Sequence, residues 1–322
     1  MIALSTPVSL PPSPPRLSYG QAVMSLGSCF SQGIATRLRA GALDVLVNPF
    51  GIQYNPLSIA AALERILEGR PFEAGELVET SGGYASLLHH GSFTRRRRED
   101  ALELMNSSLE RAAAQLQRLD FLLLTWGTSY VYRWGETGRV VSNCHKLPEC
   151  LFHRQRASLD ELAACWLPLL ERLFALRPEL QIITTVSPVR HLRDGAVGNA
   201  RSKATLLLLS ELLAERYPDR LHYFPSYELM MDELRDYRYY AEDMTHPSEL
   251  AERLIAERLT QWWLSPEAQR GITEAERLLR ELRHRPLSSE AEAHRERLER
   301  LEAKLAAFYR QYPSALDLAA LV

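Results

Sequence analysis

The sequence predicts an α/β fold in which helices cover a central parallel sheet. Strand-like and helix-like segments alternate along the chain, which is the pattern of strands joined by crossover helices. In addition, residues 121–126 and 181–186 are largely apolar runs without polar alternation, which is typical of strands buried on both faces of a parallel sheet.

The elements before the first of these runs alternate regularly. The first strand ends at Gly27, and the second helix shows apolar residues with a helical period. We expect strands at residues 22–26 and 43–47 and helices at residues 30–40, 56–67 and 99–119. A loop-rich segment is expected at residues 69–93.

The alternation continues after the central strand at 121–126. Helices are predicted at residues 159–176 and 203–217. Strands are predicted at residues 181–186 and 221–224, and the second of these is short.

The composition changes beyond Pro266. Leucine-spaced charged segments at residues 268–283 and 290–309, with Pro286 between them, predict an antiparallel helical hairpin. Their glutamates and arginines are typical of a solvated helix face, and a homodimer contact is the alternative. We therefore expect an α/β domain at residues 1–264 and a helical hairpin extension at 265–322.

Composition excludes several classes of protein. The 322 residues include 38 Lys+Arg and 40 Asp+Glu, a formal charge of −2, so a basic footprint for nucleic acid is absent. No apolar run reaches the ~18 residues of a membrane span, and prolines interrupt the N-terminal segment where a secretory signal would be apolar. Four cysteines are too few for a disulfide framework, so we expect reduced thiols and a cytoplasmic protein.

A candidate nucleophile lies where the first strand meets the first helix. Gly27, Ser28 and Cys29 occupy this turn, and ligands of open α/β sheets bind at the carboxyl ends of strands. The free N–H groups of a helix start stabilise a thiolate or an oxyanion. A turn glycine beside a buried structural thiol is the alternative interpretation.

A candidate base follows the last strand. Asp243 and His246 are three residues apart, which brings a carboxylate and an imidazole to one side of a turn. A carboxylate on one ring nitrogen fixes the tautomer and leaves the other nitrogen as a base. The alternative is a capping aspartate with a surface histidine. Pro247 is expected in the first turn of the next helix.

Two further groups of residues have weaker interpretations. The spacing of Cys144, His145, Cys150 and His153 matches no usual zinc pattern, so we expect no metal and no cofactor. His145 is more consistent with a substrate contact or an alternative base. The basic run at residues 95–98 is typical of a solvated loop, or alternatively binds an anionic substrate such as coenzyme A or a phosphopantetheine carrier.

Taken together, the motifs resemble the GSCFA family, a group placed with the SGNH, or GDSL-like, hydrolases. The resemblance spans about residues 7–263. It rests on residues 27–30, 48–51, 127–130, 142–146, 224–228 and 232–237, the last leading to Asp243 and His246.

The resemblance implies a three-layer α/β/α sandwich, a nucleophile after the first strand and the Asp-x-x-His pair. By register with the wider group's Gly-Asp-Ser motif, Cys29 is the nucleophile; by chemical identity it is Ser28. We favour Cys29, because a thiolate at a helix start beside an imidazole is easily activated.

The resemblance also implies an oxyanion hole. Gly51 stands where the group has a glycine N–H after the second strand. Ser129 stands where the group has an asparagine, so a hydroxyl or the nearby Asn143 would have to donate instead. Loss of such a donor costs about 10²–10³ in rate, which weakens the expectation of robust esterase activity.

The expected activity is therefore hydrolysis or transfer of an acyl group from an ester or thioester through a covalent acyl-enzyme. Water as acceptor makes an esterase or thioesterase, and a hydroxyl or amine makes an acyltransferase. The alternative is a non-catalytic protein that binds a small molecule or a partner on a degenerate SGNH fold.

Overall fold

Five parallel strands form the central sheet of the structure, a computed structural model that describes residues 6–283 and 291–321. The strand order is β10-β9-β5-β1-β2, and every neighbouring pair is parallel. This confirms the predicted sheet. The strands are β1 (Ala22–Gly27), β2 (Asp44–Val47), β5 (Leu119–Trp126), β9 (Gln181–Val186) and β10 (Leu221–Tyr223).

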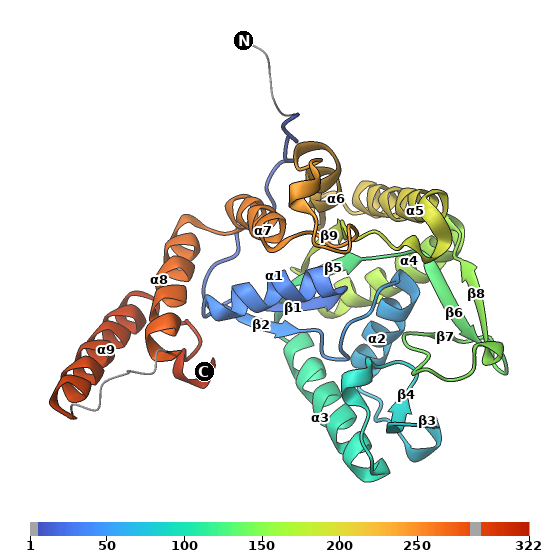
Figure 1. Ribbon diagram of the computed structural model, residues 1–322, viewed down its shortest axis with the longest axis horizontal. Helices are drawn as coiled ribbons and strands as arrows, with labels where there is room; N and C mark the ends of the chain where they lie inside the picture. The colour runs from blue at the N-terminus through green and yellow to red at the C-terminus, as the bar shows by residue number, and fades with distance from the viewer. Residues whose placement is uncertain (1–5, 284–290, 322) are drawn as a thin grey trace.

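Helices cover both faces of this sheet (Figure 1). Along β1 and β5 alternate side chains point to opposite faces: Met24 and Leu122 pack into one apolar cluster, Val23 and Phe121 into another. The predicted three-layer sandwich is thereby confirmed. The first cluster is completed by α2 (Pro56–Glu68), α3 (Arg98–Leu116), α4 (Leu159–Leu176) and α5 (Gly195–Arg216), and the second by α1 (Cys29–Ala40) and α7 (Glu249–Trp263).

Local sequence signals explain where several helices begin and end. Asn55 caps α2 by accepting the N–H of Ser58 at 2.8 Å, and Gly69 ends the same helix in the left-handed conformation. Ser248 caps α7, so Pro247 directly precedes the cap. The prediction that Pro247 lies in the first turn of this helix is therefore wrong.

Helix α5 begins eight residues earlier than its leucine pattern predicts. Its first turns contain Gly198 and Asn199, which are weak helix formers. Tertiary contacts hold them: a Cβ on Gly198 would lie 3.1 Å from the hydroxyl of Tyr130, and Asn199 accepts the backbone N–H of His191 at 2.9 Å. Packing therefore decides the start of this helix.

Two small antiparallel sheets, not predicted from the sequence, extend from the sandwich. A hairpin of β3 (Leu77–Thr80) and β4 (Gly83–Ser86) lies in the segment expected to be loop-rich. The second sheet, in the order β7-β6-β8, follows β5 directly. Its strands are β6 (Tyr130–Trp134), β7 (Val140–Val141) and β8 (Phe152–Arg156).

The C-terminal hairpin consists of α8 (Pro266–Arg283) and α9 (Ala291–Gln311), as predicted; the expected start of α9 at Glu290 lies outside the described residues. Glu281 and Lys304 form an ion pair between the two helices. Ile272 of α8 packs into the same cluster as α1, and Figure 1 shows the hairpin at the β2 edge of the sheet. The domain division at residue 264 and a homodimer through this hairpin stay predictions.

Short helical segments complete the chain. Within the described residues, no helix combines the length and the apolarity needed to cross a membrane. The segments are α6 (Ser226–Glu228), a π-helical turn at Leu229–Glu233, and 3-10 turns at Ala74–Glu76, Gly91–Phe93, Glu149–Leu151, Leu192–Asp194, Tyr237–Tyr239 and Ala319–Leu321.

Gly27, the last residue of β1, has a φ of 151°, which side chains rarely adopt. A Cβ there would lie 2.3 Å from the carbonyl oxygen of Thr125 on β5. The two strands therefore approach so closely, just before the candidate nucleophile, that only glycine fits.

We expect Gly27→Ala to lower the free energy of unfolding by about 3 kcal/mol or more, because backbone strain adds to overpacking. Gly69→Ala is the matched control: its φ is also positive, at 60°, but no atom of residues 6–283 or 291–321 lies within 4 Å of a new Cβ. This variant should cost only about 1 kcal/mol. Urea unfolding measures both; equal losses would contradict the close-approach argument.

Candidate active site

A cleft of about 420 Å³ lies at the carboxyl ends of β1, β5 and β9. Its lining comes from the loops that follow these strands, from the loop between β2 and α2, from the small sheet after β5 and from the loop before α7. The lining residues are Ser28, Cys29, Tyr54, Asn55, Thr128, Tyr130, Tyr132, Val141, Ser142, Arg154, Val189, Arg190, His191, Leu192, Arg193 and His246. The cleft therefore contains both the candidate nucleophile and the candidate base.

Cys29 is the first residue of α1 and is partly buried. Burial raises the pKa of its thiol, while the backbone N–H groups of Phe30 and of Cys29 itself lower it by a smaller amount. Because the pKa stays above its ordinary value, the thiol is protonated at neutral pH. A reaction at this sulfur therefore needs a base.

Ser28 differs from Cys29 in its accessibility. It is the N-cap residue of α1, but its side chain makes no capping bond. Only 1% of the residue is exposed, and its Oγ is buried without a hydrogen-bond partner among the described residues. Both residues line the cleft, and Cys29 is the more accessible of the two.

Asp243 and His246 form a hydrogen-bonded pair. The Nδ1 of His246 lies 2.5 Å from Oδ2 of Asp243, while Oδ1 accepts the backbone N–H groups of Thr245 and His246, both at 2.9 Å. These backbone and imidazole hydrogen bonds hold the pKa of Asp243 well below its usual range, so the carboxylate stays ionised. With Nδ1 held in this way, Nε2 is left for the cleft.

Among the residues that the sequence assigned to the oxyanion hole or to substrate contact, none lines the cleft. Gly51 uses its N–H on the carbonyl of Asn48 at 2.7 Å, and Ser129 is buried in contact with Ser202. Asn143 accepts the N–H of His145, whose ring bonds to the carbonyl of Ser86. Thr128 and Ser142, the neighbours of two of these residues, line the cleft instead.

The comparison with known families gives one match. The GSCFA family matches residues 22–259, a range that contains Cys29, Asp243 and His246. The chain belongs to the GSCFA family. No curated protein shows significant sequence similarity to it.

Among solved structures, 17 chains resemble this GSCFA protein. An acetyl xylan esterase from the rumen bacterium Butyrivibrio proteoclasticus shares 13% identity and a TM-score of 0.39, over 76% of this chain and 64% of that one. A family 3 carbohydrate esterase from Talaromyces cellulolyticus shares 10% identity and a TM-score of 0.36, over 79% and 99%. A family 3 carbohydrate esterase from Clostridium thermocellum shares 11% identity and a TM-score of 0.34, over 75% of this chain and 94% of that one.

Most of the side chains that line the cleft of this GSCFA protein were not predicted from its sequence. Tyr130 and Tyr132 are on one face of β6, and Arg154 stands opposite Tyr132 on β8, with its guanidinium 4.4 Å from the ring centre of Tyr130. The i, i+2 alternation of the two tyrosines was the available signal. Arg190 and His191 follow the carboxyl end of β9, as Cys29 follows that of β1. Because ligands of open α/β sheets bind at these strand ends, the same rule pointed to both residues.

His191 is a neutral group in this cleft. Burial, followed by the nearby charges of Lys203 and His246, lowers its pKa to about 4. Its Nε2 is buried without a hydrogen-bond partner in the described part of the chain. A Cβ on Gly127 would lie 3.1 Å from this nitrogen, so the glycine keeps the ring close to the end of β5.

Lys203 of α5 is buried behind the cleft. Its Nζ donates hydrogen bonds of 2.6 Å to the carbonyls of Gly127 and Ser187, which follow β5 and β9. No carboxylate of the described residues lies within ion-pair distance. Burial lowers the pKa of its amine to about 7, and the proximity of Cys29 opposes that shift.

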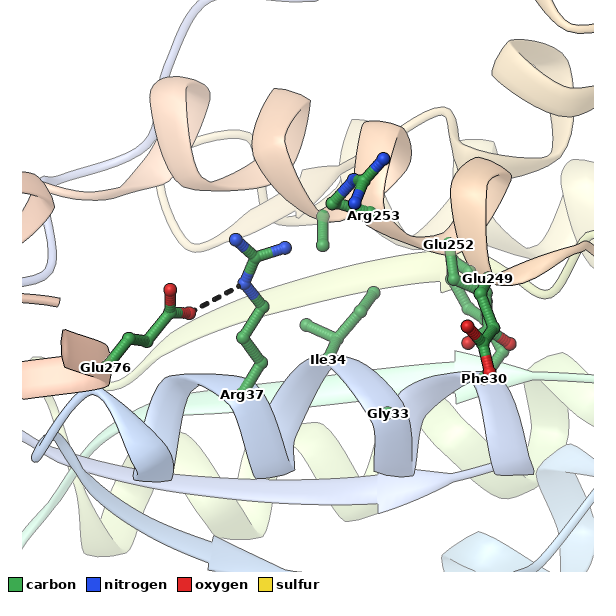
Figure 2. A pocket seen from close by; sticks show the side chains of 9 residues that line it. Phe30, Gly33, Ile34, Arg37, Glu249, Glu252, Arg253 and Glu276 are labelled. Atoms are coloured by element: carbon green, nitrogen blue, oxygen red, sulfur yellow. Dashed lines mark hydrogen bonds and ion pairs between the residues drawn. The ribbon is translucent and has the colours of Figure 1, made fainter. Parts of the chain in front are cut away.

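A second hollow, of about 300 Å³, lies between α1, α7 and α8. Figure 2 shows Arg37 bonded to Glu276 there, with Glu249 and Glu252 above Phe30. Burial raises the pKa of Glu252, and His246 opposes this; the charge of Glu252 in turn raises the pKa of Cys29. A carboxylate of this hollow therefore contributes to the raised pKa of the Cys29 thiol. Within the described ranges, no three His, Cys, Asp or Glu side chains are placed to hold a metal ion.

Lys203 should make the stability of the protein depend on pH. Its amine titrates near pH 7 when folded, against a reference value of 10.5, so between these values the unfolded chain binds more protons. Stability should rise with pH in this window, by up to about 1.4 kcal/mol per pH unit relative to Lys203→Met. Urea unfolding at pH 7, 8 and 9 measures the difference.

The control is Lys304→Met, which removes an exposed lysine paired with Glu281. A difference between wild type and Lys203→Met that does not change with pH would contradict the lowered pKa.

Proposed function

We propose that the protein is an acyl hydrolase or acyltransferase that forms a covalent acyl-enzyme on Cys29. The supporting observation is that His246, which is hydrogen-bonded to Asp243, and the thiol at the start of α1 line one cleft. A nucleophile, a base and a group that orients the base are the components of such a mechanism.

In the first step, Nε2 of His246 accepts the proton of the Cys29 thiol as the sulfur attacks the carbonyl carbon of an ester or thioester. The C–S bond forms, and the carbonyl oxygen becomes an oxyanion. The bond to the leaving alkoxide or thiolate then breaks, and that group takes the proton from His246. Because the pKa of Cys29 is raised by burial, transfer of this proton is a required part of the step.

In the second step, His246 accepts a proton from water or from an acceptor hydroxyl or amine, which attacks the acyl carbon. The C–S bond breaks, and the sulfur recovers a proton from His246. Throughout, the ionised Asp243 orients the ring and stabilises the imidazolium. The N–H groups at the start of α1 are our proposed oxyanion donors, supported by their proximity to the sulfur.

A non-catalytic binding protein is the second candidate. Two observations favour it: the raised pKa of Cys29, and the placement of Gly51, Ser129 and Asn143 outside the cleft lining. A binding protein keeps the cleft but forms no acyl-enzyme, so detection of the covalent intermediate separates the two candidates.

Incubation with activated acyl esters and thioesters should give a mass increase equal to one acyl group, as measured by intact-protein mass spectrometry. Cys29→Ala should abolish the adduct, and Ser28→Ala should keep it, because Cys29 is the more accessible group. Loss only in Ser28→Ala would assign the serine as nucleophile. No adduct with any donor would support the binding protein.

Asp243→Asn should slow acylation about ten- to a hundred-fold, because the amide nitrogen facing Nδ1 imposes the wrong imidazole tautomer. The matched control is Asp236→Asn, since Asp236 is also an exposed aspartate that accepts a backbone N–H, that of Arg238 at 2.9 Å. Stopped-flow rates of acylation give the comparison. Equal rates in the two variants would show that Asp243 does not orient the base.

A further inference from the structure

The guanidinium groups of the cleft suggest which substrates it accepts. We propose that Arg190 and Arg193 bind an anionic group, a carboxylate or a phosphate, on the substrate that reacts at Cys29. This inference rests on the proposed function and specifies its substrate class. It concerns the recognition of the substrate, whereas the proposed mechanism concerns the reacting atoms.

The ionised side chains that line the cleft are all positively charged. Arg154, Arg190 and Arg193 line it together with two histidines, and none of the described aspartates or glutamates does. The whole chain has a formal charge of −2, so this excess of positive groups is local. The second hollow, in contrast, combines three glutamates with two arginines. A cleft of one sign attracts ligands of the opposite sign.

The three arginines differ in their counter-charges. Arg154 is paired with Asp194 through both of its terminal nitrogens and is thereby neutralised. Arg193 pairs with Glu149, but both side chains are more than half exposed, so water and salt weaken the attraction. Arg190 has no carboxylate within ion-pair distance among the described residues. Arg190 and Arg193 are therefore the two cations available to a ligand.

Both side chains are already held in position. The guanidinium of Arg190 lies 4.7 Å from the ring centre of Tyr240 and donates to the carbonyl of Met244. Arg193 donates to the hydroxyl of Tyr132. An arginine that is ordered before binding loses less side-chain entropy when it binds an anion, and its remaining N–H donors suit carboxylate and phosphate oxygens.

The anion site is next to the reacting groups. The Met244 carbonyl that Arg190 contacts belongs to the turn of the Asp243–His246 pair, and the backbone N–H of Arg190 donates to Thr245 of the same turn at 3.1 Å. A volume of about 420 Å³ accommodates a small molecule or one end of a larger one. The charged group of the substrate is therefore near its reacting carbonyl.

The basic run at residues 95–98 has no part in this site. None of its four arginines lines the cleft; Arg97 lies near Glu99 and Asp100, and Arg98 stacks on Tyr84. Anion recognition by this protein is thus assigned to the loop after β9.

The test compares iodoacetate, an anion, with neutral iodoacetamide as alkylating agents of Cys29, followed by peptide mass spectrometry. The ratio of the two rates, relative to the same ratio for the uncharged thiol N-acetylcysteine amide, reports the charge of the cleft and does not depend on ester chemistry. We expect the iodoacetate-to-iodoacetamide rate ratio at Cys29 to exceed that of the reference thiol about ten-fold at low salt and to fall as ionic strength increases. Arg193→Met and Arg190→Met should each lower it by at least about three-fold.

Arg190→Lys should restore most of the ratio, which separates loss of charge from displacement of the Asp243–His246 turn. The matched control is Arg96→Met, which removes one positive charge from the exposed basic run. A ratio equal to that of N-acetylcysteine amide, or one that falls equally in Arg96→Met, would overturn the proposal.

A second measurement uses acyl donors. Acylation by mono-4-nitrophenyl succinate is compared with its methyl ester, and acylation by 4-acetoxyphenylacetate with its methyl ester, which places the charge on the acyl or on the leaving side. Preference for an anion in either pair, lost in Arg193→Met, supports the inference. Acylation without such a preference overturns it and leaves the proposed function intact, whereas no acylation by any donor refutes the proposed function.

Discussion

The amine of Lys203 connects the two halves of the cleft. It bonds to the carbonyls of Gly127 and Ser187, the residues that directly follow β5 and β9. These carbonyls lie past the end of the sheet, where no strand hydrogen bond satisfies them, and an unpaired buried carbonyl is costly. By joining them, the lysine holds the two chain segments from which the cleft walls start: the small β6–β8 sheet after β5 and the arginine-bearing loop after β9.

The reacting groups have opposite environments. The Asp243–His246 pair is half-exposed and held by short-range hydrogen bonds of one turn, whereas Cys29 is partly buried at the start of a helix that packs against the sheet. Burial keeps the thiol protonated, and exposure keeps the base able to exchange protons with solvent. In the proposed mechanism, the partly buried thiol is the nucleophile, and the half-exposed His246 is the base that activates it.

The electrostatics of the cleft follow from which elements bring which charges. The carboxylate that acts on Cys29 comes from α7, whereas the guanidinium groups that line the cleft come from the loop after β9 and from β8. A ligand in the cleft therefore contacts the arginines, while the carboxylates of α7 line the second hollow. In a chain whose total charge is close to zero, this separation is produced by the fold alone.

The sequence by itself determined the parallel sheet, the position of Cys29 at a strand-to-helix turn and the Asp243–His246 pair, because hydrophobic periodicity and short spacings are local properties. The tertiary structure decided what surrounds them. Tyr132 and Arg154 meet only because β6 and β8 pair across 22 residues, and Arg190 reaches the cleft because β9 lies next to β5. Likewise Ser129 and Thr128 are neighbours in sequence, yet only the threonine lines the cleft. Which of two adjacent side chains faces a ligand is set by backbone direction and long-range packing, and periodicity does not encode either in a loop.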